Sequence, residues 1–66
     1  MTDKDRIIER AEVMYHNFIK WAASYYENKN RKEYLDIMHD ARLIGNILGK
    51  NFTEVEIEVK EKAKEN

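Results

Sequence analysis

Apolar side chains recur every three or four residues near the N-terminus, and this spacing is the strongest constraint on the fold. The central positions, with gaps of 4, 3, 4, 3 and 4, are Ile7, Ala11, Met14, Phe18, Trp21 and Tyr25. The flanking positions are Ile8, Tyr15 and Ala22 on one side and Ile19 and Tyr26 on the other. Such spacing is typical of one side of an amphipathic helix. We predict a helix from about residue 3 to 27, whose apolar side must be packed because propensity alone does not hold such a helix together.

Polar residues at both ends support these bounds. Thr2 is a good N-cap, and Asp5 follows at the spacing of a capping box. The segment 28–30, Asn-Lys-Asn, interrupts the apolar pattern, and asparagine tolerates the left-handed C-cap conformation. Asn30 is also a good N-cap, with Glu33 three residues later to complete a second capping box. A three-residue link predicts an antiparallel helical hairpin.

The second helix is expected from about residue 31 to 48. Its apolar positions, with gaps of 3, 4, 3 and 4, are Tyr34, Ile37, Ala41, Ile44 and Leu48, broadened by Leu35, Met38 and Ile47. Ala41 and Gly45 are small. We interpret them as core residues, although another helix could also approach closely there. Gly49 is the expected C-cap glycine.

The segment from residue 54 to 63 is open to two interpretations. Val55, Ile57 and Val59 alternate with charged residues, as in a strand. A helix explains more, because its apolar spacing continues to Ala63, Thr53 and Glu56 match a capping box, and Phe52 and Ile57 match a hydrophobic staple. No other segment resembles a strand, so we predict a short helix over 54–63. A strand here would need a partner from another subunit.

The length of the chain favours self-association. A domain of 66 residues buries only about 60% of the surface its unfolded chain exposes, and this one has no cysteine for a disulfide or a thiolate metal site. Folding the hairpin places Leu48 near residues 10 to 12, so Ile7 and Ile8 overhang and need cover from the third helix or a second chain. We therefore predict an all-α single domain that forms a helical-bundle oligomer, with a dimer favoured. The expected interface residues are Ile7, Ile8, Ala11, Met14, Phe18, Ala41, Ile44 and Leu48.

Several function classes lack support in the sequence. There is no nucleophile motif and no glycine-rich phosphate loop, and His16 and His39 are expected to face solvent. We therefore expect no catalytic residue, no metal site and no cofactor. Charged residues make up 38% of the chain with a net charge of -1, which gives no general attraction to nucleic acid or membranes. The charged N-terminus lacks the pattern of a signal peptide, so a cytoplasmic location is expected, in the host cytoplasm if the gene is viral.

Aromatic and basic residues gather at the predicted hairpin tip. They are Trp21, Tyr25, Tyr26, Lys29, Arg31, Lys32 and Tyr34, and the three cations contrast with the overall charge of -1. One interpretation is that the aromatic residues form core and the cations keep the turn soluble. Another is that they stack on bases and bind phosphates. A third is that they anchor a protein partner, since Trp, Tyr and Arg are frequent at interfaces.

The segment 40–46, Asp-Ala-Arg-Leu-Ile-Gly-Asn, resembles the second helix of the hairpin in phage proteins that sequester cyclic-nucleotide immune signals. The resemblance covers seven residues, chiefly Asp40, Ala41 and Asn46, and the proline-serine-arginine lead-in of that family is absent. It implies nucleotide binding. Our first functional hypothesis is nonetheless a non-enzymatic regulator or inhibitor that binds a protein partner through an apolar and aromatic helical surface. The alternative is a nucleotide- or oligonucleotide-binding hairpin, such as a sequestering protein that counters host defence signalling.

Overall fold

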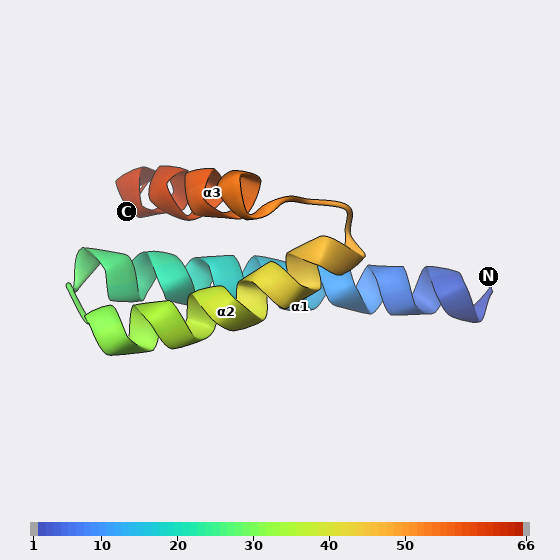
Figure 1. The fold of residues 1–66 in the computed structure, drawn as a ribbon. Helices are drawn as coiled ribbons and strands as arrows, with labels where there is room; N and C mark the ends of the chain where they lie inside the picture. The colour runs from blue at the N-terminus through green and yellow to red at the C-terminus, as the bar shows by residue number, and fades with distance from the viewer. Residues whose placement is uncertain (1, 66) are drawn as a thin grey trace.

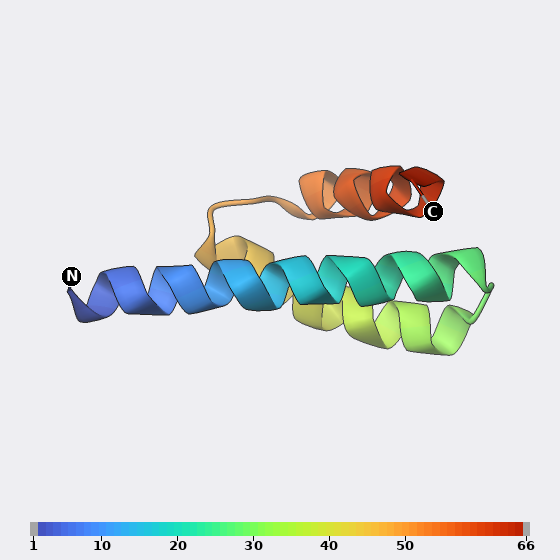
Figure 2. The ribbon, with the colours of Figure 1, turned by 180° about the vertical axis from the view of Figure 1, so that it is seen from behind.

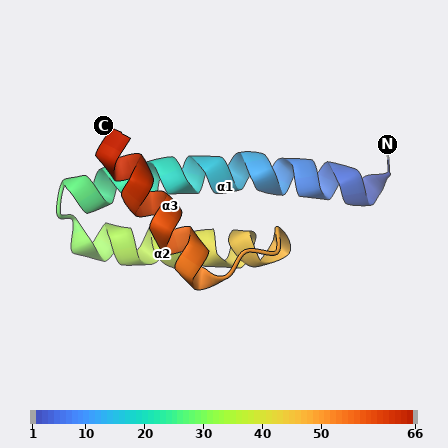
Figure 3. The same ribbon diagram turned by 90° about the horizontal axis from the view of Figure 1, so that it is seen from above.

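A computed structural model of the chain describes residues 2–65, and these residues form three α-helices without any strand. Helix α1 spans Asp3–Glu27, α2 spans Arg31–Ile47 and α3 spans Phe52–Glu65. The first two form an antiparallel hairpin, and α3 lies across one side of it (Figures 1 and 3). The predicted hairpin and the helical interpretation of the C-terminal segment are confirmed. Helix α3 begins two residues before and ends two residues after the predicted range 54–63.

The start of α1 is held by the predicted capping box. The Thr2 hydroxyl accepts a hydrogen bond from the backbone N–H of Asp5 at 3.3 Å, and the Asp5 carboxylate accepts one from the backbone N–H of Thr2 at 3.4 Å. Two N–H groups that the first turn would leave unpaired are thus satisfied.

The turn between α1 and α2 differs from the prediction. The left-handed residue is Lys29, with φ of 58°, and not an asparagine. Its N–H donates to the carbonyl of Tyr26 at 3.3 Å, and the N–H of Asn30 donates to the carbonyl of Tyr25 at 3.0 Å. This is the Schellman pattern, and the length of the link places Lys29 at its left-handed position. Asn30 is the N-cap of α2, but its side chain makes no capping hydrogen bond, so the predicted capping box with Glu33 is wrong.

The link between α2 and α3 uses a second Schellman turn. Gly49 has the predicted left-handed conformation with φ of 78°, its N–H donates to the carbonyl of Asn46 at 3.1 Å, and the N–H of Lys50 donates to the carbonyl of Gly45 at 2.8 Å. The cap of α3 is Asn51, whose side-chain oxygen accepts from the N–H of Glu54 at 2.8 Å.

The start predicted for α3 is therefore wrong in detail. With Asn51 as the cap, Thr53 lies inside the helix and forms no capping box with Glu56. The predicted staple also falls with this cap, because Phe52 is then the first residue of the helix and does not precede its cap. Phe52 and Ile57 remain 43% and 49% exposed. Phe52 instead packs under Arg42, whose guanidinium carbon lies 5.7 Å from the ring centroid.

The core lies where the three helices meet. Its buried members are Tyr15, Ile19, Ala22 and Ala23 from α1, Met38 and Ala41 from α2, and Val55, Val59 and Ala63 from α3. The buried side of α1 is thus rotated from the predicted centre, because α3 packs beside Tyr15 and Ile19. Ile7, Met14 and Trp21 stay 61%, 46% and 51% exposed.

Gly45 lies at the closest approach of the helices. A Cβ atom at this position would lie 3.0 Å from a methyl group of Val55 and 3.4 Å from the ring of Tyr15. The missing side chain lets α1 and α3 both reach α2 here. The small residues of the second helix are therefore part of the core, as interpreted from the sequence, and a third helix also approaches closely at Gly45.

Helix α3 runs back toward the hairpin tip and away from the N-terminus (Figure 2). Helix α2 ends beside the N-terminal half of α1, where Leu48 shares a hollow with Ile8 and Glu12. The first turns of α1 extend past this point. The sequence left two candidates to cover Ile7 and Ile8, the third helix or a second chain. The direction of α3 excludes the third helix, and the side chains of Ile7 and Ile8 are 61% and 36% exposed.

The left-handed conformation of Lys29 predicts that a glycine at this position stabilises the protein. A residue with a Cβ atom in the left-handed conformation lowers the stability of the fold by roughly 1–2 kcal/mol. Glycine avoids this cost but loses more backbone entropy on folding, so Lys29→Gly should raise the free energy of unfolding by about 0.5–1 kcal/mol. The measurement is thermal unfolding followed by circular dichroism, with a shift of roughly 4–8 °C per kcal/mol for a domain of this size.

The matched control is Lys29→Ala, which removes the same charge but keeps the Cβ. Its melting temperature should not rise. An equal rise for both variants would assign the effect to the lost charge and contradict the argument from backbone conformation.

Candidate functional site

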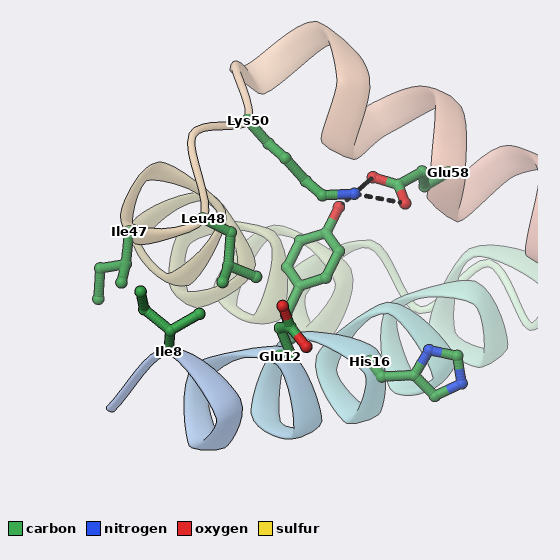
Figure 4. Close-up of a pocket in the computed structure, with 8 residues that line it drawn as sticks. Ile8, Glu12, His16, Ile47, Leu48, Lys50 and Glu58 are labelled. Atoms are coloured by element: carbon green, nitrogen blue, oxygen red, sulfur yellow. Dashed lines mark hydrogen bonds and ion pairs between the residues drawn. The ribbon is translucent and has the colours of Figure 1, made fainter. Parts of the chain in front are cut away.

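A hollow of about 420 Å³ opens where the end of α2 meets α1 and α3 (Figure 4). Its lining residues come from all three helices and the second link: Ile8, Glu12, Tyr15, His16, Ile47, Leu48, Lys50 and Glu58. Figure 4 shows Lys50 reaching toward Glu58 and the His16 ring directed away from this pair. The hollow therefore combines an apolar rim with one cluster of polar groups.

The Glu58 carboxylate is the centre of that cluster. Both of its oxygens accept hydrogen bonds from the Lys50 ammonium at 3.0 Å, and the Tyr15 hydroxyl also donates to it. Lys50 lies 4.9 Å from the centroid of the Tyr15 ring. Burial, and then the neighbouring Glu58 charge, raise the pKa of the Tyr15 phenol above its usual range. These groups satisfy one another, so the cluster ties α3 to α1.

The histidines lie on exposed surfaces, as predicted. Within residues 2–65, no three His, Asp or Glu side chains gather closely enough to hold a metal ion. In the same part of the chain, no helix is both long and apolar enough to cross a membrane.

The hairpin tip forms a second hollow of about 420 Å³. Of the seven tip residues singled out from the sequence, it brings together Tyr25, Tyr26, Lys29, Arg31 and Tyr34. The rings of Tyr26 and Tyr34 pack with centroids 5.6 Å apart. Burial, followed by the charge of Glu56 and the proximity of Tyr26, raises the pKa of Tyr34.

Two of the predicted tip residues lie elsewhere. Trp21 packs against Phe18, with ring centroids 6.0 Å apart, and it does not line the tip hollow. Lys32 is exposed outside the same hollow. Both positions follow from the helical repeat. Trp21 lies one full turn of α1 farther from the tip than Tyr25, and Lys32 points about 100° away from Arg31.

A third hollow, of about 600 Å³, lies at the same end of the molecule. It is lined by Tyr26, Glu27, Lys29, Lys60, Ala63 and Lys64. Lys60 and Lys64 of α3 were not predicted as site residues. Their spacing of four residues places them on one side of a helix, but only the direction of α3 brings that side to the hairpin tip.

The residues expected at an oligomer interface divide into two groups. Ala11 and Ala41 are 4% and 0% exposed within one chain, so a second chain cannot contact them directly. The others are exposed or half-buried: Ile7, Ile8, Met14, Phe18, Ile44 and Leu48.

Part of the second group, together with Trp21 and Ile37, follows one side of the hairpin. Ile7, Met14 and Trp21 are exposed and spaced by seven residues, so they follow one line along α1. On α2, Ile37 and Ile44 share the same spacing and are half-buried against the core, as is Phe18 on α1. Met14 and Ile44 each precede a buried residue near α3, Tyr15 and Gly45, and therefore point about 100° away from it. We call this set, made by Ile7, Met14, Phe18, Trp21, Ile37 and Ile44, the hairpin face.

Comparison of the chain with protein-family models, with curated proteins and with solved structures gives no match.

The raised pKa of Tyr15 predicts a loss of stability at alkaline pH. In the unfolded chain the phenol ionises near its ordinary pKa of about 10, whereas the folded protein keeps it neutral to higher pH. The stability that Tyr15 contributes is thus complete below pH 10 and is lost as pH rises toward the folded-state pKa. Urea unfolding of the native protein from pH 8 to 11.5 should show a falling free energy of unfolding above about pH 10.

The variant Tyr15→Phe separates the effect of this phenol from that of every other ionisable group. It should be less stable at pH 8, by about 1 kcal/mol for the lost hydrogen bond, but its free energy of unfolding should fall less steeply above pH 10. Parallel curves for the two proteins would contradict the assignment to Tyr15.

Proposed function

We propose that this protein is a non-enzymatic helical interaction module that binds a protein partner through the hairpin face. The observation that carries the proposal is the exposure of Ile7, Met14 and Trp21, at 61%, 46% and 51%, along one line of a helix whose core lies on another side. Exposed apolar surfaces of this kind are typical of interaction sites, and tryptophan is among the most frequent anchor residues. The proposed role is that of a small cytoplasmic regulator or inhibitor.

The occupant that the hairpin face fits best is a second copy of the chain. Met14 is equidistant in sequence from Ile7 and Trp21, so two antiparallel α1 helices related by a twofold axis at Met14 would pair Ile7 of each copy with Trp21 of the other. The same pairing lays the overhanging first turns of each α1 on the partner's hairpin. Two hairpins joined in this way make a four-helix bundle, with α3 on the outside of each half.

We propose a non-enzymatic protein because the carboxylate at the centre of the polar cluster in Figure 4 is already paired. Glu58 accepts from Lys50 and Tyr15, which leaves it engaged rather than poised to take a proton from a substrate. The cluster has a structural role in holding α3.

Sedimentation equilibrium of the native protein and of Met14→Glu tests the proposal. The native chain of 8.0 kDa should approach twice this mass as its concentration rises through the micromolar range. Met14→Glu brings two carboxylates together at the twofold axis and should weaken the dimer about thirty-fold or more, because a buried unpaired charge costs at least about 2 kcal/mol.

The matched control is Ile57→Glu on the outer side of α3, where the native side chain is 49% exposed. It should dimerise like the native protein, and circular dichroism should show all three proteins equally helical. A native protein that stays monomeric at every concentration, or an equal loss of dimer in Ile57→Glu, would overturn the proposal.

A further inference from the structure

The direction of α3 assembles a basic and aromatic surface that neither segment forms alone. The C-terminal half of α3 ends at the hairpin tip (Figure 1). Lys60 and Lys64 consequently share a hollow of about 600 Å³ with Tyr26 and Lys29. Tyr26 and Lys29 also line the tip hollow of about 420 Å³, to which Arg31 contributes.

Tyr26 is a lining residue of both hollows, as is Lys29. The Tyr26 side chain is 45% exposed, and its ring packs on the ring of Tyr34 at 5.6 Å, which restricts its orientation. The surface therefore presents one accessible, positioned aromatic ring that is shared by two adjoining, cation-lined hollows.

The cations of this surface are not neutralised by the fold. The ion pairs in residues 2–65 join Lys50 to Glu58 and Lys62 to Glu65, so Lys29, Arg31, Lys60 and Lys64 have no carboxylate within 4.0 Å. Glu27 is the acidic residue among the lining of the two hollows. The linings of the two hollows thus hold four cations and one carboxylate, in a chain whose net charge is -1, and Glu56 lies outside these linings near Tyr34.

We propose that this end of the molecule binds single-stranded nucleic acid, with one base stacked on Tyr26 and the flanking phosphates in the two hollows. An aromatic ring stacks on the face of any unpaired base, and adjacent cations bind the phosphates of the backbone. Two adjoining hollows that share the ring fit a strand whose backbone continues past the stacked base, whereas a mononucleotide has no such continuation. A duplex keeps its bases stacked inside, so it cannot offer one to the ring.

This site is independent of the hairpin face and of the function proposed for that face. None of the residues that line the two hollows belongs to the hairpin face. The two proposals can therefore fail separately.

Fluorescence polarisation of a labelled oligothymidylate of about eight nucleotides, within the usual range of site sizes, tests the proposal. The native protein should bind it, with an affinity that falls as salt rises. The double variant Lys60→Glu/Lys64→Glu should bind at least ten-fold more weakly and with a shallower salt dependence, because each lost phosphate contact removes about 0.7 from the slope of log affinity against log salt.

Two further variants separate stacking from folding. Tyr26→Ala should weaken binding about five-fold or more, since stacking on an aromatic ring contributes about 1–3 kcal/mol per base. Tyr26→Phe keeps the ring and should bind like the native protein. Circular dichroism of each variant checks that the helices remain.

The charge-matched control is Lys4→Glu/Lys20→Glu, two exposed lysines of α1 outside both hollows. Its affinity should fall much less than that of the α3 double variant. The proposal is overturned by an equal loss in the control, by no binding of oligothymidylate at low salt, or by equally tight binding of the matching duplex or of polyglutamate.

Discussion

The close contact of α3 with the hairpin is the constraint on which the rest of the structure depends. At Gly45 the missing side chain lets both Val55 of α3 and the ring of Tyr15 approach the backbone of α2, because a Cβ atom there would lie 3.0 Å from Val55 and 3.4 Å from Tyr15. The Tyr15 hydroxyl and the Lys50 ammonium then hold the Glu58 carboxylate from two sides. Packing sets the distance between α3 and the hairpin, and the polar cluster sets the point along α1 at which α3 is attached.

The core that results is made largely of small residues. Alanines supply four of its nine buried positions, at Ala22, Ala23, Ala41 and Ala63, while larger apolar side chains such as Ile7, Met14 and Trp21 stay exposed. Small residues let helices approach closely, so three short helices can pack with little apolar volume between them. Because the core is filled by small residues, the larger apolar side chains stay exposed and contribute to the hairpin face, on which the proposed interaction depends.

Both proposed sites depend on the direction in which α3 runs. Because α3 runs to the hairpin tip, it leaves the first turns of α1 uncovered and lies over one side of the hairpin (Figures 1 and 2). By ending there, it adds Lys60 and Lys64 to the tyrosines and cations of the turn. A protein partner and a single-stranded nucleic acid would therefore meet different surfaces of the same small bundle.

Local sequence signals determined the helices. The three-to-four-residue spacing predicted α1 and α2, Thr2 and Asp5 capped the first helix, and Gly49 ended the second, because each signal acts within one or two turns. Tertiary structure decided which side of α1 is buried, the direction of α3, and the cap at Asn51 in place of Thr53. The tip hollow was partly visible from the sequence, since Tyr25 to Tyr34 are close along the chain. Lys60 was not, because its place depends on the packing of Val55 against Gly45, a contact between residues that no local pattern relates.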